Sequence, residues 1–320
     1  MRQKHVLRKD EKLTSLMQYR IFGTNIDSEL EFPHWPKRVE TSHAESNPVA
    51  IRLGSISRDW DDKIRPGAWY HVEPNHVFIR IDDVGRFLIS DGCTVVYEAE
   101  GSNCNDAWLY VEGVITGALL HQRKIWPLHG CAVLKPNGAV AAFVGPRGIG
   151  KSTLLYELQR LDFPFLADDI VAITIDERNV PWVHPGFPQG KLCLDAVERF
   201  GLKIESLRSI GTPGKEKFSV PLHSPFVDSP KRLDEVFLLT QSESADIQCE
   251  TIKGLQKLRL LSENTYRLEF VSNPMDFDLL FRNITCIAPH IEVSMVRRPS
   301  NGNSVEDLAR FIISKWEATN

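Results

Sequence analysis

The chain has 320 residues, of which 42% are hydrophobic and 25% are charged, so it can bury one large core or two modest ones. Its formal net charge of -4 and its pI near 6.2 give no general electrostatic attraction to nucleic acid or to an anionic membrane surface. We therefore expect neither nucleic acid nor a membrane as a partner.

The cysteines and the first residues indicate a cellular compartment. No Cys-x-x-Cys pair and no histidine at zinc-finger spacing is present, so we expect the cysteines to be reduced and mostly buried. They are Cys93, Cys104, Cys131, Cys193, Cys249 and Cys286. The opening MRQKHVLRKDEKL is charged throughout and lacks the apolar segment of a signal peptide, and no later run is long enough to span a bilayer. These features predict a cytoplasmic protein.

The first third of the chain is rich in short β-like runs. Residues 1–18 are expected to be a flexible segment, because they are largely polar and basic. Residues 19–120 are expected to form an N-terminal β-rich region, with the runs YRIFGTNI, VAIRLGSI, HVFIRID, RFLIS and TVVYEA, of which the last three predict a meander. Residues 106–123 place apolar side chains at helical intervals after Asp106 as a candidate cap, although a strand remains an alternative for their first half.

Residues 121–320 are expected to form a second unit with a mixed sheet. In CAVLKPNGAVAAFVG, two β-rich runs flank the turn residues Pro136-Asn137-Gly138, which predicts a hairpin where a doubly wound sheet would have a helix. Further helices are predicted at 152–161, 194–208 and 254–263, and a closing helix in SVEDLARFIISKWEA, capped by Ser304. Strands are predicted in FPFLADDIVAITI, DEVFLLTQ and IEVSMVRRP, and an ordered surface loop in VPWVHPGFPQGKL.

The stretch GPRGIGKST fits the phosphate-loop pattern G-x-x-x-x-G-K-[ST] in full. Its glycines allow the backbone to wrap a polyphosphate, with Lys151 reaching the β and γ phosphates and the Ser152 hydroxyl as a Mg²⁺ ligand. The alternative is a chance match, but the apolar run before it and the helical run after it supply the expected context. The candidate nucleotide-binding residues are Gly145, Pro146, Arg147, Gly148, Ile149, Gly150, Lys151, Ser152 and Thr153.

Two further positions are candidates for chemistry. Asp168 and Asp169 interrupt an apolar run, where unpaired carboxylates would be costly to bury, so one could hold Mg²⁺ while its neighbour accepts a proton from an attacking hydroxyl. A turn or capping role for the pair is the alternative. The predicted hairpin could bring His129 beside the loop to orient an acceptor or tune the aspartates, and a hydrogen-bonded structural histidine is the alternative there.

In their order and spacing, LHG, GPRGIGKST and FLADD resemble the HPr kinase/phosphorylase family and the wider group with the ATP-dependent phosphoenolpyruvate carboxykinase type of P-loop fold. The resemblance covers about residues 121–194. It implies an α/β fold with a mixed-sheet P-loop kinase core of this type, preceded here by the N-terminal β-rich region. It also implies phosphorylation of a hydroxyl, typically serine, by ATP with Mg²⁺. In the implied roles, Asp168 is the general base and Asp169 assists Mg²⁺.

Some positions differ from the bacterial HPr enzymes. Pro146 and Arg147 stand where a polar-Ser pair is usual, Thr153 stands where Glu is common, and a later phosphorolysis signature is missing. These differences argue against a reversible phosphorylase and against regulation of sugar uptake. YRIFGTNIDSELEFP, GRFLISDG and GALLHQRKIWPLHG are instead similar to HPr-kinase-related proteins of peptide-modification clusters, including lasso-peptide kinases. That similarity implies a serine, often the C-terminal one, of a ribosomal precursor peptide as the acceptor.

Three lysines are candidates for the acceptor side of the site, and two other functions remain as alternatives. Lys191 could form a rigid loop over the active site together with residues 184–188, and Lys215 and Lys217 could contact phosphate or a peptide carboxylate. A solvated surface role is the alternative for each lysine. A small-molecule or carboxykinase-like enzyme on the same scaffold remains open, as does a regulatory module that binds ATP without transfer. An ABC-type ATPase is disfavoured, because no L-S-G-G-Q-like segment follows. The oligomeric state is left open, a homo-oligomer included.

Overall fold

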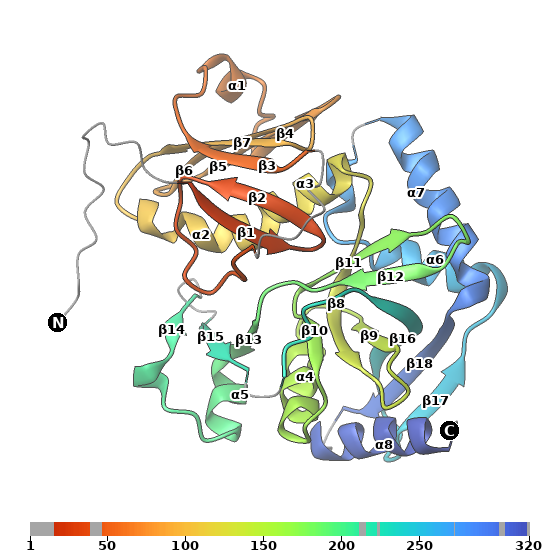
Figure 1. The fold of residues 1–320 in the computed structure, drawn as a ribbon. Coiled ribbons are helices and arrows are strands. Elements are labelled where there is room, and N and C mark those ends of the chain that lie inside the picture. Colours follow the sequence, from red (N-terminus) through yellow and green to blue (C-terminus); the bar gives the residue numbers. More distant parts are fainter. Residues whose placement is uncertain are drawn as a thin grey trace.

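The computed structural model describes residues 16–38, 47–210, 216–222, 225–271, 273–300 and 305–318. Over these ranges the chain is a mixed α/β protein with two large mixed sheets and one small antiparallel sheet (Figure 1). Within the same ranges, no helix combines the length and the apolar character needed to cross a membrane. Most of the predicted N-terminal flexible segment lies outside the described residues, and so do Ser304 and Lys215.

The first sheet has the strand order β1-β2-β3-β7-β6-β5-β4. Its strands are β1 (Met17–Ile21), β2 (Thr24–Ser28), β3 (Val49–Leu53), β4 (Tyr70–Glu73), β5 (His76–Ile81), β6 (Gly85–Ser90) and β7 (Thr94–Ala99), with the short helix α1 (Asp59–Asp62) between β3 and β4. The predicted meander is confirmed, since β5, β6 and β7 pair antiparallel in succession. Asp91 and Gly92 both take positive φ, which lets the chain reverse tightly between β6 and β7.

A helix lies under this sheet and separates it from the second one (Figure 1). It runs through η1 (Cys104–Asp106), α2 (Ala107–Tyr110), the π-helical turn η2 (Val111–Ile115) and α3 (Thr116–Gln122). The predicted helix is confirmed and the strand alternative is wrong, although Asp106 makes no side-chain capping hydrogen bond. The segment from Val111 to His121 is buried, because it packs between the first sheet and Ile170 and Ala172 of the second.

The second sheet has the order β10-β8-β11-β12-β16-β18-β17, and β9 pairs with both β8 and β16. Its strands are β8 (Trp126–Leu134), β9 (Val140–Val144), β10 (Phe165–Ala167), β11 (Ile170–Ile175), β12 (Pro181–His184), β16 (Lys231–Ser242), β17 (Gln248–Thr251) and β18 (Glu292–Pro299). The predicted hairpin is confirmed, since β8 and β9 pair antiparallel across the turn at Pro136-Asn137-Gly138. The sheet is mixed because β16 runs parallel to β9 and β18.

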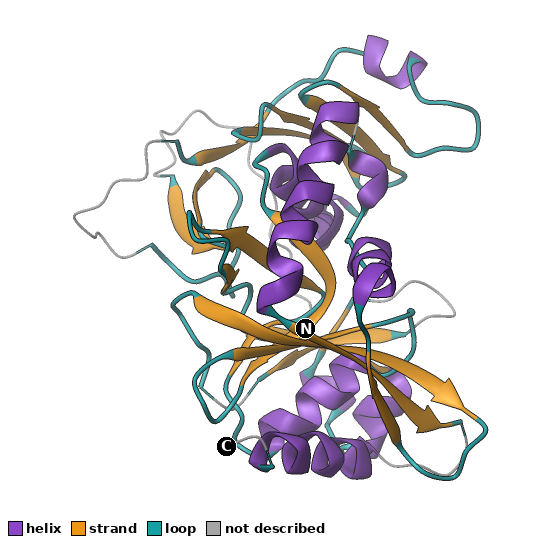
Figure 2. Cartoon of the chain, turned by 90° about the vertical axis from the view of Figure 1, so that its right-hand side faces the viewer, coloured by secondary structure: helices purple, strands orange, loops and turns teal. Residues whose placement is uncertain are grey.

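Helices cover both faces of the second sheet (Figure 2). On one face lie α6 (Gly254–Glu263) and α7 (Pro274–Ile287), flanked by η4 (Leu268–Phe270) and η5 (Ala288–His290). On the other lie α4 (Lys151–Arg160) and the closing helix α8 (Val305–Glu317). The predicted helices at 152–161, 254–263 and the C-terminus are confirmed, whereas α7 and β17 were not predicted from the sequence.

Two predictions after the central strands are wrong. The predicted surface loop at 180–192 forms β12 and most of β13 (Gln189–Cys193), because its prolines fall at a strand start and between the strands. The predicted helix at 194–208 ends early: α5 (Leu194–Arg199) stops before Gly201, whose φ of 63° suits the residue after a helix end. The chain then continues through η3 (Ile204–Ser206), β14 (Arg208–Ser209) and β15 (Lys217–Pro221), which form the small sheet with β13.

All six cysteines are unpaired, but the expectation that most are buried is wrong. Only Cys131 is buried among them, while Cys193 and Cys286 are exposed.

Candidate functional site

A glycine-rich loop, residues 145–150, joins β9 to the N-terminus of α4. At Gly145, with φ of 141°, a Cβ atom would lie 2.6 Å from the Leu239 carbonyl oxygen, so a side chain does not fit. At Gly148 and Gly150, with φ of 83° and 101°, a Cβ would meet nothing within 4 Å. The loop thus leaves open space beside its backbone at the positive end of a ten-residue helix, an arrangement that suits a bound anion.

Lys151 begins α4 and folds back over this loop. Its Nζ donates to the carbonyl oxygens of Gly145 at 2.7 Å and Pro146 at 3.2 Å. Burial lowers the pKa of the Lys151 ammonium. Pro146 and Arg147 are exposed, Thr153 is half-buried, and Ile149 is buried behind the loop, with its carbonyl accepting from Arg298 at 3.3 Å.

Asp168 connects α4 to β13. Its Oδ1 accepts a 2.9 Å hydrogen bond from Ser152 Oγ, and its Oδ2 accepts a 2.8 Å hydrogen bond from the main-chain N–H of Lys191. Burial and the neighbouring Asp169 carboxylate raise the pKa of Asp168. The Ser152 hydroxyl and the Asp168 carboxylate therefore form a pair of hard oxygen ligands next to the glycine-rich loop.

Asp169 faces two basic side chains. Its Oδ2 lies 3.2 Å from Lys191 Nζ, and its Oδ1 lies 3.7 Å from His129 Nδ1, which also donates to the Asp169 carbonyl oxygen at 3.3 Å. Burial acts to raise the pKa of Asp169, but the positive charges of Lys191 and Lys217 outweigh it and hold that pKa below its usual range. Asp169 therefore stays ionised at neutral pH.

The strand register explains how His129 reaches the aspartates. β8 and β11 pair antiparallel with His129 opposite Ile170, so the histidine lies beside the turn that carries Asp169. The following Gly130 is required by packing, since a Cβ there would lie 2.3 Å from the Phe143 carbonyl oxygen. Burial and the Lys151 charge lower the pKa of His129, which favours a neutral imidazole.

These groups share one cavity of about 1060 Å³. Of the predicted residues, Ile149 does not line it and Lys215 lies outside the described residues. The other predicted positions all border it: Gly145, Pro146, Arg147, Gly148, Gly150, Lys151, Ser152, Thr153, His129, Asp168, Asp169, Lys191 and Lys217.

The opposite wall of this cavity was not predicted from the sequence; it comes from α6 and the residues after it. Tyr266 and Arg267 lie there, and the Tyr266 ring is centred 5.5 Å from the His129 ring. Burial and the Asp169 charge raise the pKa of Tyr266 to about 12. No motif in ENTYRLEF indicates such a role; the one available signal is the pair Gly113 and Gly117 in a predicted helix, which indicates a close approach by another segment.

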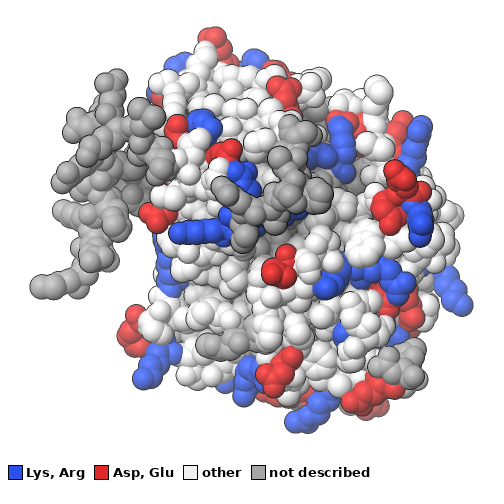
Figure 3. Space-filling view, viewed as in Figure 1, with Lys and Arg blue, Asp and Glu red and all other residues white. Residues whose placement is uncertain are grey.

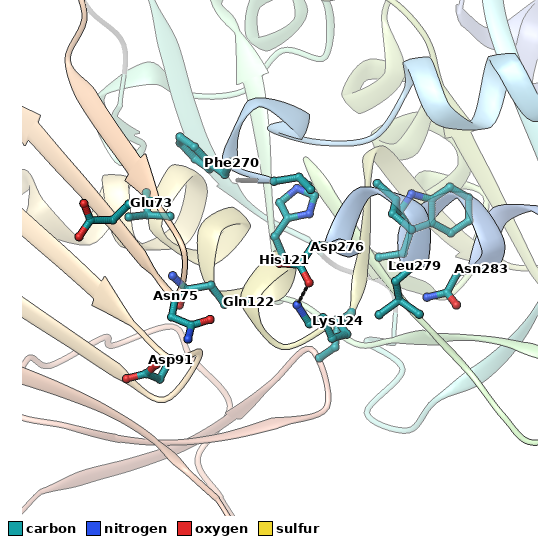
Figure 4. Close-up of a pocket in the computed structure, with 15 residues that line it drawn as sticks. Glu73, Asn75, Asp91, His121, Gln122, Lys124, Phe270, Asp276, Leu279 and Asn283 are labelled. Atoms are coloured by element: carbon teal, nitrogen blue, oxygen red, sulfur yellow. Dashed lines mark hydrogen bonds and ion pairs between the residues drawn. The ribbon is translucent and has the colours of Figure 1, made fainter. Parts of the chain in front are cut away.

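A second, smaller cavity of about 270 Å³ lies between the first sheet and α7 (Figure 4). His121, Lys124 and Asp276 border it, and Lys124 forms an ion pair with Asp276. The glycine-rich loop and the aspartate pair do not line it, so we assign the chemistry to the larger cavity. On the face drawn in Figure 3, the acidic and basic side chains of the described residues are interspersed.

No family model matches the chain, and no curated protein matches it. Among solved structures, the Hpr(Ser) kinase/phosphatase from Coxiella burnetii is similar over 60% of this chain and 95% of its own, with 12% sequence identity and a TM-score of 0.29.

Proposed function

We propose that the chain is an ATP- and Mg²⁺-dependent kinase that transfers the γ-phosphate to a serine hydroxyl of a protein or of a ribosomal peptide precursor. The observation that carries the proposal is the 2.9 Å hydrogen bond between Ser152 Oγ and Asp168 Oδ1 beside the glycine-rich loop. In P-loop enzymes, a serine or threonine at this position and a strand-end aspartate hold Mg²⁺. The second unit would then be a P-loop kinase core of the HPr kinase/phosphoenolpyruvate carboxykinase type.

The residues present fit a nucleotide and Mg²⁺. Gly148 and Gly150 border open space in which a phosphate can approach the backbone amides. Mg²⁺ commonly takes one or two protein oxygen ligands together with phosphate oxygens and water, so Ser152 and Asp168 are sufficient to hold it. When bound, Mg²⁺ neutralises charge on the phosphates. Lys151 and the loop amides would stabilise the negative charge of the transferring group.

The geometry favours a division of roles opposite to the one that the family resemblance implies. Asp168 contacts Ser152, so we assign Asp168 to Mg²⁺. Asp169 lies in the same cavity between Lys191 and His129, so we assign Asp169 to the proton of the acceptor hydroxyl. Its lowered pKa is compatible with this role, because a loose phosphoryl-transfer transition state asks mainly for positioning and little for base strength.

Two observations bear on the acceptor. A peptide acceptor is supported by the motifs in the first region that are similar to those of peptide kinases. Lys191 and Lys217 add positive charge to the cavity on the side of the aspartates, where it can attract a phosphate or a carboxylate. The alternative small-molecule kinase uses the same transfer chemistry and differs only in its acceptor.

The test mixes the purified protein with ATP, Mg²⁺ and serine-terminated precursor peptides and measures peptide mass. We expect the mass gain of one phosphate, absent when the peptide serine is replaced by alanine and absent in Asp169→Asn. Asp162→Asn is the matched control, because Asp162 is exposed and shares the positive φ of Asp169, 64° against 73°. Intact ATP binding without transfer to peptides, proteins or small hydroxyl compounds would overturn the kinase proposal and favour a nucleotide-binding module.

A further inference from the structure

Tyr266 packs on one face of the helix at residues 107–122, which follows the strands of the N-terminal β-rich region (the first region). Three residues of this helix, spaced four apart, contact Tyr266: Gly113, Gly117 and His121. A Cβ at Gly117 would lie 2.8 Å from Cε1 of the Tyr266 ring, and a Cβ at Gly113 would lie 3.5 Å from its hydroxyl. His121 Nε2 donates to the Tyr266 carbonyl oxygen at 2.7 Å. The absence of a side chain at Gly117 is therefore what admits the tyrosine ring.

Tyr266 also contacts the start of β8 and the candidate site. Its main-chain N–H donates to the Pro127 carbonyl oxygen at 2.8 Å, and Thr265 forms a β-bridge with Leu128, so the segment is fixed along the start of β8. The Tyr266 and His129 rings lie 5.5 Å apart, centroid to centroid, with 31° between their planes. His129 in turn donates to the carbonyl oxygen of Asp169.

We infer that Tyr266 is a positioning residue of the transfer site, and that the helix of the first region holds it there through Gly117 and His121. This inference rests on the proposed kinase function. The tyrosine ring restricts the His129 ring to the orientation in which its Nδ1 donates to the Asp169 carbonyl oxygen. This hydrogen bond fixes the turn, and the turn sets the direction of the Asp169 carboxylate. The first region is thus part of the catalytic unit rather than a detachable binding module.

A second contact ties the same helix to the site. Glu112, next to Gly113, is buried and accepts a 3.0 Å hydrogen bond from Trp35 Nε1. Trp35 packs against Phe187, at 5.2 Å between ring centroids, in the loop that leads into β13 and Lys191. The helix therefore supports both the Tyr266 side and the Lys191 side of the aspartates.

The two glycines provide a matched pair of variants. Gly117→Ala places a methyl group inside the Tyr266 ring contact, whereas Gly113→Ala meets its hydroxyl at an ordinary van der Waals distance. Neither glycine has positive φ, so both changes are compatible with a helix. We expect Gly117→Ala to lower kcat about tenfold or more and Gly113→Ala to lower it less than about twofold, with the Kd of a Mg²⁺-bound ATP analogue unchanged in both. Equal kcat values in the two variants would overturn the inference.

Variants of Tyr266 separate positioning from packing. Tyr266→Phe keeps the ring beside His129 and should retain most of kcat, while Tyr266→Leu should lose it. The double variant Gly117→Ala/Tyr266→Leu should be no slower than Tyr266→Leu alone, because both changes act on one contact. Multiplying losses in the double variant would contradict a shared role.

An NMR measurement tests the geometry without any activity. At a pH where the imidazole is neutral, the ring protons of His129, identified by their loss in His129→Gln, should shift in Tyr266→Leu and Gly117→Ala but not in Gly113→Ala. If these shifts are found and no acceptor is ever phosphorylated, the proposed function fails and the placement of Tyr266 stands. If the protons do not shift, or if they shift while Gly117→Ala keeps full kcat, the positioning role is overturned and the kinase proposal is untouched.

Discussion

The ammonium group of Lys191 lies 3.2 Å from Oδ2 of Asp169, and this ion pair is largely shielded from solvent, with exposed side-chain fractions of 13% and 22%. The main-chain N–H of the same lysine donates to Asp168. Burial acts to lower the pKa of Lys191, but Asp169 and Glu112 outweigh it and raise that pKa. One residue of β13 therefore holds both aspartates in place and keeps the second ionised.

Replacing Lys191 by methionine should destabilise the fold and disable the site together. Asp169 would lose its nearest positive charge in a partly buried position, which costs about 1–3 kcal/mol in the free energy of unfolding. Urea unfolding at neutral pH measures this loss, with the exposed Lys203 mutated to methionine as the control. If both variants unfolded at the same urea concentration as the parent, the ion pair would contribute nothing to the free energy of unfolding.

The glycine-rich loop could be predicted from sequence because its constraint is local. Three glycines, a lysine and a serine at fixed spacing place a turn before a helix, and the structure has that turn with positive φ at all three glycines. The hairpin before it was predictable for the same reason, since Pro136-Asn137-Gly138 carry their own turn chemistry. Local rules also explain the failures: the prolines of residues 180–192 indicate a loop, but two different sheets pair with that segment.

Gly148→Ala tests whether the loop binds a phosphate. Gly148 and Gly138 have φ of 83° and 81°, and at neither position would a Cβ meet an atom within 4 Å. Alanine should therefore lower the free energy of unfolding by the same amount at both positions, about 1 kcal/mol. Only at Gly148 would the new methyl group enter the cavity of about 1060 Å³ in which we propose that ATP binds. Calorimetric titration with an ATP analogue should show weaker binding for Gly148→Ala and parental binding for Gly138→Ala. Equal Kd values in the two variants would argue against phosphate binding by the loop.

The wall opposite the loop could not be predicted, because it depends on contacts between distant segments. Tyr266 reaches His129 from a position 137 residues further along the chain, and it does so by packing on Gly117 from the first region. Neither tyrosine nor glycine in these stretches belongs to a pattern that specifies its partner. The sequence also indicated that Asp168 and Asp169 act as a pair, but the contact of Asp168 with Ser152 is what distinguishes the two.

The two aspartates should differ in their response to Mg²⁺. If Asp168 holds the ion with Ser152, Asp168→Asn should raise the Mg²⁺ concentration needed for half-maximal activity by at least about tenfold, with activity partly recovered at high Mg²⁺. Asp169→Asn should instead lower kcat by about 10²–10⁴ at every Mg²⁺ concentration. Asparagine tolerates the positive φ of Asp169, so this variant should keep the turn. Recovery of Asp169→Asn by Mg²⁺, with none for Asp168→Asn, would restore the division of roles implied by the family resemblance.

His121 should make the fold sensitive to mild acid. Burial lowers the pKa of His121, against the weaker opposing effects of its hydrogen bond to Tyr266 and of the Glu269 and Asp276 carboxylates. The unfolded chain then binds a proton at a higher pH than the folded chain, so the stabilisation is complete above the usual histidine pKa and decreases as the pH falls below it.

His121→Gln can keep a side-chain N–H for the Tyr266 carbonyl oxygen but does not titrate. Unfolding free energies from urea denaturation at pH 7.5 and pH 5.5 should therefore fall further in the parent protein than in His121→Gln. His34 and His129, whose pKa values are also lowered, titrate in both proteins and cancel in this comparison. An equal fall in the two proteins would mean that the pKa of His121 is the same in the folded and the unfolded chain, and it would contradict this prediction.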